Sequence, residues 1–219
     1  PDKYQGYHCW TIGWYQSELI AQTDPARRYL GQFAREEVFE PLGADFHIGL
    51  PDDVPDSRIA TIRTVSKKDV HRAFRTMPLR FIIGTLFPKS LTSRSLLNID
   101  FAGDLKNFNT REVRRLEIGG GGGMGNARSI ARVFGEFANG GKTLGIPENT
   151  MNEFLKPVKR FPRRKEDIAL KLHMPFAQGV IRPRKGFQFG ASSTAFGGWG
   201  AGGSCGIADV GKQVGFCLL

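Results

Sequence analysis

A tyrosine near the start of the printed sequence has a side chain that could move a proton. Tyr7 follows Gly6, and the apolar residues after it recur with helical spacing as far as Ile20, so we expect Tyr7 at the corner where a loop enters a helix. A free phenol has a pKa of about 10, and a neighbouring ammonium group would lower that pKa and allow Tyr7 to exchange a proton. The other interpretation, that Tyr7 is an aromatic anchor of the helix, stays open on these residues alone.

Other patterns that could carry chemistry do not meet the requirements of their sites. A phosphate-binding loop needs a glycine five residues before the glycine of Gly-Lys-Thr at 141–143, but that position is Glu136. The glycine run 119–123 follows no apolar strand, so we interpret it as a flexible turn and hinge rather than a dinucleotide-binding loop. We expect no metal and no cofactor, because the histidines and cysteines lack the spacing of metal ligands or of a disulfide framework: His8, His47, His71, His173, Cys9, Cys205 and Cys217.

The chain has a formal net charge of +10, and the stretch 156–171 contributes half of this excess. Such a block could contact phosphates or an anionic membrane surface, but no aromatic platform or nucleic-acid-binding motif accompanies it. We interpret the stretch as a solvated connector and do not expect nucleic-acid binding. A basic module for nucleic acid or a lipid surface stays a third alternative. No apolar run is long enough to be a transmembrane segment.

The order of the expected elements predicts an α+β fold. Hydrophobic residues make up 40% of the chain and charged residues 24%, as in ordinary globular domains. Residues 1–115 read as a mainly helical lobe, with a lid-like insertion whose apolar stretch at 79–87 we interpret as a buried or capping segment. Residues 116–219 read as a helix at 126–139, a further helix after Pro147, and then short antiparallel strands that form a sheet lobe.

Several motifs resemble, in their order along the chain, those of the serine beta-lactamase-related and penicillin-binding-protein-like hydrolases. The segment 6–14 is similar to the tyrosine element of the class C beta-lactamase and esterase branch. Residues 196–204 are similar to the strand that lines the active site of that family. Between them, 31–51 and 126–141 resemble further segments of the family. The resemblance implies a beta-lactamase/transpeptidase-like fold with a helical lobe and an antiparallel sheet lobe.

The chemistry of the family explains why these residue types are needed. A serine, activated by a lysine one helical turn later, attacks a carbonyl carbon and forms an acyl-enzyme. By resemblance, Tyr7 is the acid/base partner, and Ala201 is the backbone donor to the tetrahedral oxyanion. Gly198, Trp199 and Gly200 would form the third, substrate-binding element, where glycine lets a substrate lie close to the backbone. The implied substrate is a small-molecule or peptide-like acyl compound.

Three departures from the family pattern affect the expected function. No serine of the 219 residues has a lysine three positions later, so the Ser-x-x-Lys motif is absent from them. Gly198 stands where the family usually has Lys or His, and Cys9 stands where class C beta-lactamases have Asn. We therefore expect a hydrolase of the esterase, peptidase or transferase type, represented by a fragment that is incomplete at both ends and inactive by itself. The alternative is a catalytically inactive family member that acts as a binding or assembly scaffold.

The expected compartment rests on the cysteines, whose odd number and lack of clustering favour reduced thiols and an intracellular location, cytoplasmic or organellar. The start at Pro1, without an apolar signal region, reads as the middle of a gene product. The sequence leaves the substrate, the compartment and the oligomeric state open.

Overall fold

The computed structural model describes residues 4–63, 77–97, 105–156, 166–185 and 187–219. The chain folds as two compact units, each made of three stretches of sequence. The first unit contains Pro1–Leu30, Ile48–Gly123 and Arg160–Met174, and the second contains Gly31–His47, Met124–Lys159 and Pro175–Leu219. Because the chain passes several times from one unit to the other, each unit combines residues from both halves of the sequence. The division into lobes 1–115 and 116–219 stays a prediction.

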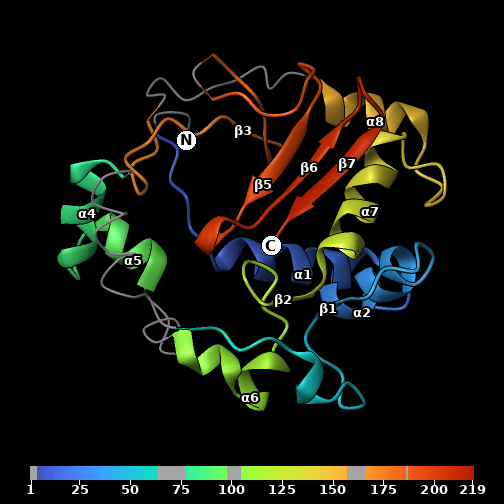
Figure 1. The fold of residues 1–219 in the computed structure, drawn as a ribbon, viewed down its shortest axis with the longest axis horizontal. Coiled ribbons are helices and arrows are strands. Elements are labelled where there is room, and N and C mark those ends of the chain that lie inside the picture. Colours follow the sequence, from blue (N-terminus) through green and yellow to red (C-terminus); the bar gives the residue numbers. More distant parts are fainter. Residues whose placement is uncertain (1–3, 64–76, 98–104, 157–165, 186) are drawn as a thin grey trace. The chain divides into compact units, whose positions relative to one another are not determined.

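The second unit is built around a five-stranded antiparallel sheet whose strands follow one another in chain order (Figure 1). The helices α7 (Ala127–Ala138) and α8 (Glu148–Leu155) precede all five strands of the sheet in the sequence, and α7 packs on its last two strands. This arrangement confirms the α+β class, with helices first and an antiparallel meander last. The strands are β3 (Phe176–Ala177), β4 (Val180–Ile181), β5 (Phe196–Trp199), β6 (Cys205–Asp209) and β7 (Val214–Leu218).

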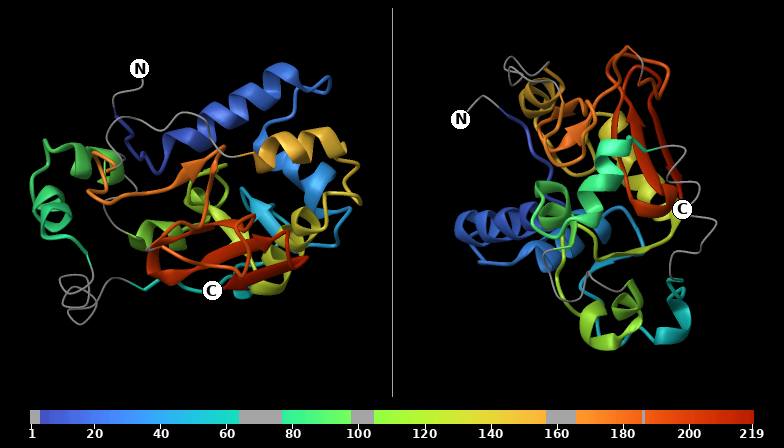
Figure 2. Two further views of the ribbon diagram at one scale, coloured as in Figure 1. Left: turned by 90° about the horizontal axis from the view of Figure 1, so that it is seen from above. Right: turned by 90° about the vertical axis from the view of Figure 1, so that its left-hand side faces the viewer.

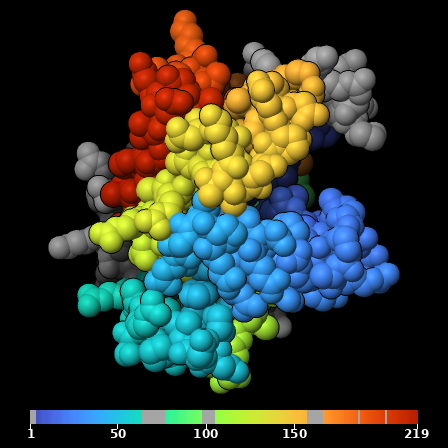
Figure 3. Space-filling view, turned by 90° about the vertical axis from the view of Figure 1, so that its right-hand side faces the viewer, coloured from blue at the N-terminus to red at the C-terminus, as the bar shows by residue number. Residues whose placement is uncertain are grey.

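The core of the second unit lies between the sheet and these helices. Phe196 of β5 and Ala208 of β6 are almost completely buried, and the ring of Phe196 lies edge-on to Phe154 with 4.9 Å between the centroids. At Gly215 of β7, an added Cβ would lie 2.1 Å from the backbone nitrogen of Gly135 in α7. Helix and strand therefore pack backbone against backbone, and Figure 3 shows the yellow surface of the helical segment against the red surface of the last strands.

Helix α7 begins and ends where its sequence signals predict. The side chain of Asn126 caps the helix by accepting a hydrogen bond from the backbone N–H of Ser129 at 2.9 Å. After the last turn, Gly140 and Gly141 have φ angles of +89° and +68°, in the left-handed region that favours glycine. Both ends are set by local chemistry, so the sequence was sufficient to place them.

The first unit is mainly helical. Its helices α4 (Leu79–Leu86) and α5 (Leu91–Leu97) lie side by side as a pair (Figure 1 and Figure 2). An added Cβ at Gly84 of α4 would lie 2.6 Å from the hydroxyl oxygen of Thr92 in α5, so glycine allows the close approach. The buried Thr92 hydroxyl donates to the carbonyl oxygen of Ala169 at 2.7 Å. The helices of this unit are α1 (Thr11–Thr23), α4 (Leu79–Leu86), α5 (Leu91–Leu97) and α6 (Arg111–Arg114), with 3-10 turns at Asp56–Arg58 and Leu105–Asn109.

Helix α4 corrects the interpretation of the apolar stretch 79–87 as a buried segment. Ile82 is the buried residue of this helix, whereas Leu79, Leu86 and Phe87 are 66%, 71% and 62% exposed. A helix directs its side chains all around its axis, so one that packs through a single face leaves the other apolar side chains exposed. A role of this stretch as a lid stays a prediction.

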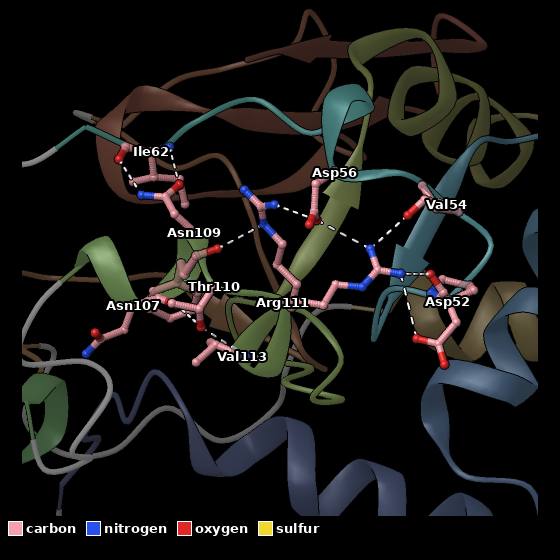
Figure 4. Close-up of polar contacts among 12 residues, drawn as sticks. Asp52, Val54, Asp56, Ile62, Asn107, Asn109, Thr110, Arg111 and Val113 are labelled. Carbon is pink, nitrogen blue, oxygen red and sulfur yellow. Dashed lines mark hydrogen bonds and ion pairs between the residues drawn. The ribbon is translucent and has the colours of Figure 1, made fainter.

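An arginine–aspartate cluster anchors α6 in the first unit (Figure 4). Asp56 lies between two guanidinium groups, 2.8 Å from Arg114 Nη1 and 3.4 Å from Arg111 Nη1. Arg111 also donates to the carbonyl oxygens of Val54 and Pro51, each at 2.7 Å. The hydrogen bond from Arg114 is the main cause that holds the pKa of Asp56 below its ordinary value. The cluster therefore fixes the segment around Asp56 to α6.

The remaining elements are short. Helix α2 (Leu30–Ala34) continues into a π-helical turn at Arg35–Phe39. The strands β1 (Phe46–Ile48) and β2 (Gly123–Gly125) form a separate two-stranded sheet. At Gly125, an added Cβ would lie 2.4 Å from the ring of Phe46, so a side chain at this position would displace that ring.

The glycine run 119–123 packs against the start of α1 within the first unit. An added Cβ at Gly120 would lie 2.0 Å from the carbonyl oxygen of Cys9, and one at Gly121 would lie 2.8 Å from the ring of Trp10. Residues 119–121 form a turn, as predicted. The glycines also allow a close contact between two backbones, and the interpretation of the run as a hinge stays a prediction.

Candidate functional site

Tyr7 lies in a non-helical segment that precedes α1 in the first unit. Gln5 forms a parallel β-bridge with Asp167, and the backbone N–H of Ile168 donates to the carbonyl oxygen of Gln5 at 2.9 Å. The helix begins only at Thr11, so the loop-to-helix corner predicted at Tyr7 lies further along the chain. The position of Tyr7 is therefore set by this β-bridge rather than by the helix.

The surroundings of Tyr7 favour a neutral phenol. Burial raises the pKa of Tyr7 above its ordinary value, and the electrostatic interactions with Cys9 and Asp167 raise it further. With a raised pKa the hydroxyl stays protonated at neutral pH. In this state Tyr7 can donate a proton, whereas a phenolate base would need a cation close enough to lower the pKa.

A buried carboxylate and a half-buried thiol belong to the same part of the first unit. Asp167 is fully buried, and its Oδ1 accepts hydrogen bonds from the backbone N–H groups of Ala169 and Leu170, each at 2.9 Å. The Cys9 thiol donates to the carbonyl oxygen of Ser95 at 3.4 Å. Burial raises the pKa of Cys9 to about 11, so it is a protonated thiol at neutral pH. Cys9 therefore contributes a contact within the fold and is not an activated nucleophile.

The predicted third element forms β5 and the turn that follows it, in the second unit. The backbone N–H of Gly200 donates to the carbonyl oxygen of Ser204 at 2.8 Å, so it points toward β6. Gly200 has an extended conformation, and successive N–H groups of an extended backbone point to opposite edges. The N–H groups of Trp199 and Ala201 therefore point to the edge of β5 away from β6.

The glycines of β5 and β6 differ in the space around them. An added Cβ at Gly197 would lie 2.3 Å from the carbonyl oxygen of Gly206, and one at Gly206 would lie 2.1 Å from the ring of Phe134 in α7. An added Cβ at Gly198 would meet no heavy atom within 4 Å. Packing therefore requires glycine at 197 and 206 but leaves room for a larger residue at 198, where the family usually has Lys or His.

A buried carboxylate, whose role the sequence did not reveal, fastens the loop that leads into β5. Asp209 at the end of β6 is 5% exposed, and its Oδ2 accepts from the backbone N–H groups of Ala191 at 2.5 Å and Ser192 at 3.1 Å. Its Oδ1 accepts from the Ser192 hydroxyl. Burial pulls the pKa of Asp209 up, but these hydrogen bonds outweigh burial and hold it below its ordinary value. The only signal in the sequence was an acidic residue at the end of an apolar strand.

We expect Asp209→Asn to destabilise the chain by about 1–3 kcal/mol at pH 7, because an amide cannot replace both acceptor oxygens of the buried carboxylate. A carboxyl with a lowered pKa in the folded state stabilises the fold above its ordinary pKa, and this stabilisation is lost as the pH falls through the folded-state pKa. Urea unfolding at pH 7 and at about pH 3 measures both effects. Asp53→Asn, at an exposed position, is the matched control, and an equal loss in both variants would contradict the anchoring role.

The other features of the sequence give no further site within the described residues. No three His, Cys, Asp or Glu side chains of that part lie close enough together to hold a metal ion. No helix described by the structure is long and apolar enough to cross a membrane. In the basic stretch, residues 157–165 lie outside the described ranges. At its two ends, Lys156 pairs with Glu153, and the Lys171 ammonium group donates to the carbonyl oxygen of Ile168 at 2.5 Å.

Comparison with known proteins identifies relatives along the whole chain. A family model described as "Beta-lactamase" matches residues 1–219. The curated protein "Esterase/beta-lactamase LipL" of Mycobacterium tuberculosis is 29% identical over 229 residues, which cover 97% of this chain and 47% of LipL. The chain thus spans about half the length of the curated relative that it matches.

Solved structures of related proteins also match this chain along almost its whole length. A penicillin-binding protein homologue from Caulobacter crescentus is 27% identical with a TM-score of 0.74, and the match covers 98% of this chain and 52% of the homologue. A family VIII carboxylesterase is 28% identical with a TM-score of 0.73, and the match covers 99% of this chain and 52% of the carboxylesterase. EstA from Arthrobacter nitroguajacolicus is 26% identical with a TM-score of 0.75, and the match covers 99% of this chain and 54% of EstA. Because the family model matches every residue, the chain belongs to the beta-lactamase family and has the beta-lactamase/transpeptidase-like α+β fold.

Proposed function

We propose that the chain supplies the tyrosine and strand elements of a serine hydrolase that cleaves esters or amides through an acyl-enzyme. Membership of the beta-lactamase family supports this class of reaction. The observation that carries the proposal is the hydrogen bond from Gly200 to Ser204, because it turns the amides of Trp199 and Ala201 to the other edge of β5. An amide held in this way is suited to stabilise an oxyanion without reorganisation.

The proposed nucleophile is the serine of a Ser-x-x-Lys pair supplied by sequence outside the 219 residues. Its Oγ bonds to the substrate carbonyl carbon while its proton passes to the lysine, and the amide of Ala201 donates to the resulting oxyanion. Tyr7 gives its phenolic proton to the leaving alcohol or amine as the bond to carbon breaks, and the lysine returns a proton to Tyr7. Gly198, Trp199 and Gly200 line the substrate. Water then releases the acyl group by the same steps in reverse.

We propose esters of small acyl compounds as the preferred substrates. Gly198 provides no charge or donor of the kind that Lys or His usually offers to the substrate in this family. Cys9 replaces the Asn of class C beta-lactamases, and its thiol already donates to Ser95. A site without these two polar groups favours an ester over an amide. The alcohol of an ester needs less help to leave than the amine of an amide.

A fluorophosphonate probe tests the proposal, because it reacts with an activated serine. We expect no labelling of the 219-residue chain. We expect labelling of a protein in which the coding sequence upstream of residue 1 adds a Ser-x-x-Lys pair, and no labelling when that serine is changed to alanine. An upstream sequence without such a pair, or an added pair that does not react, would contradict the proposal.

A catalytically inactive relative that serves as a binding scaffold is the second candidate. The observation that favours it is Gly198, an open position without a polar side chain. A longer protein with an intact Ser-x-x-Lys pair that is neither labelled nor able to hydrolyse p-nitrophenyl esters would support the scaffold and end the hydrolase proposal.

A further inference from the structure

Three aromatic rings form a cluster at the end of β5, in the second unit. The centroids of Phe189 and Trp199 are 4.5 Å apart, those of Phe187 and Trp199 are 5.4 Å apart, and those of Phe187 and Phe189 are 6.0 Å apart. All three pairs meet edge to face, with interplanar angles between 66° and 78°. This is the arrangement that aromatic rings prefer, so Phe187 and Phe189 hold the Trp199 ring in a fixed orientation.

The Trp199 ring is held in place but remains accessible, with 39% of the residue exposed. Gly206, which pairs with Gly198, faces Phe134 of α7, so Gly198 points to the helix-covered face of the sheet. Successive residues of a strand point to opposite faces, and Trp199 therefore lies on the face away from α7. A rigid apolar ring that is already ordered loses little conformational entropy when a ligand covers it.

Trp199 also connects this cluster to the proposed oxyanion edge. Its own N–H and that of Ala201 point away from β6, because Gly200 donates to Ser204. The neighbours Gly198 and Gly200 have no side chains that would separate a ligand from the strand. A ligand with one polar oxygen and an apolar chain can thus place the oxygen at the strand edge and the chain on the Trp199 ring.

We propose that Trp199, Phe187 and Phe189 form an apolar subsite that binds the neutral acyl chain of an ester substrate and sets the preferred chain length. The inference rests on the proposed function for the kind of substrate, but the subsite itself lies wholly within the second unit. The cluster contains no charge, so the subsite selects by apolar area. Each CH₂ group that the rings remove from water strengthens binding by up to about fourfold.

Binding of unreactive ketones to the 219-residue chain tests the subsite. The three tryptophans are replaced by 5-fluorotryptophan, and their ¹⁹F resonances are assigned with Trp10→Phe, Trp14→Phe and Trp199→Phe. The probes are 2-butanone, 2-hexanone and 2-octanone, neutral analogues of esters with increasing chain length. We expect the Trp199 resonance alone to shift, and the affinity to rise by about two- to fourfold for each added CH₂ group.

Variants of Phe189 decide whether the cluster is responsible. Phe189→Leu should weaken the binding of 2-octanone at least about threefold and leave the binding of 2-butanone unchanged, because the edge-to-face support of Trp199 is lost. Phe189→Tyr keeps the ring and should keep the affinity. Phe216→Leu on β7, which changes an exposed ring outside the cluster, is the matched control. Equal affinity for all three ketones, no shift of the Trp199 resonance, or the same loss in the Phe189 and Phe216 variants would overturn the proposal.

The experiment separates this inference from the proposed function, because it measures binding without any bond cleavage. If the protein binds the ketones at Trp199 but carries no reactive serine, the result supports the subsite and contradicts the hydrolase proposal. If the protein is labelled by a fluorophosphonate but does not bind the ketones at Trp199, the result contradicts the subsite and supports the hydrolase proposal.

Discussion

Replacing Tyr7 with Phe should lower kcat for ester hydrolysis by about 10²- to 10⁴-fold in a protein that carries the Ser-x-x-Lys pair, which is the usual contribution of a general acid or base. The substitution removes the hydroxyl and its proton but keeps the half-buried aromatic ring. KM should change little, because the proton is needed as the leaving group departs and not when the substrate binds. Steady-state hydrolysis of an alkyl ester, whose alkoxide leaving group needs protonation, measures both constants.

Tyr15→Phe is the matched control for this prediction. Tyr15 lies on α1 and is 74% exposed, so the loss of its hydroxyl should leave kcat unchanged. A leaving group with a low pKa needs less protonation, so the effect of Tyr7→Phe should be larger for an alkyl ester than for a p-nitrophenyl ester. Equal effects on the two esters, or a Tyr7→Phe enzyme with normal kcat, would show that Tyr7 is an aromatic anchor and not an acid.

Gly13→Ala should destabilise the chain by about 3 kcal/mol, the upper end of the usual range for overpacking. An added Cβ at Gly13 would lie 2.6 Å from the backbone nitrogen of Gly120 and 2.7 Å from backbone atoms of Gly119. A side chain could rotate away from such a contact, whereas here a backbone must move. Thermal unfolding should show a decrease in Tm of about 6 °C or more for a chain of this size.

Gly198→Ala is the control for the effect of the added methyl group. The Cβ at this position would meet no heavy atom within 4 Å, and we expect almost no change in Tm. Equal Tm values for Gly13→Ala and wild type would mean that α1 and the glycine run separate readily. That result would support the interpretation of 119–123 as a hinge.

Helix α7 shows which part of the fold could be predicted from the sequence. Its amphipathic spacing, its Asn126 cap and the glycines after its last turn are all local signals, and the structure confirms the helix between them. The strands β3, β4, β6 and β7 were predicted for the same reason, because Gly and Pro turns separate short apolar runs, whereas β5 was expected from the family resemblance. The α+β class followed from the order of these elements.

Contacts between distant segments account for the errors. The glycine content of 119–123 did not show that these glycines allow the backbone of Cys9 and the ring of Trp10 to approach. The helix expected from Tyr7 begins at Thr11, because Gln5 bridges to Asp167 instead. The apolar stretch 79–87 contains helix α4, which buries Ile82 but leaves Leu79 and Leu86 exposed, and no local signal shows how much of a helix its neighbours cover.

The candidate site was predicted in part, and from family resemblance rather than from spacing. Tyr7 and the strand with Gly198 were chosen because their motifs resemble family elements in the right order. The residues that position this strand were not identified: Asp209 and Ser192 fasten its entry loop, and Phe189 supports Trp199. Such partners come together only in the folded sheet, so their spacing in the sequence did not indicate them.

A crystal structure of the longer protein with a phosphonate bonded to its nucleophilic serine tests the central claim most directly. The phosphonate oxygens stand in for the oxyanion and the leaving-group oxygen of the tetrahedral intermediate. We predict that the backbone nitrogen of Ala201 and the hydroxyl of Tyr7 each lie about 3 Å from one of these oxygens. A phosphonate bound to the serine with the Tyr7 hydroxyl too far away to touch it would contradict the account.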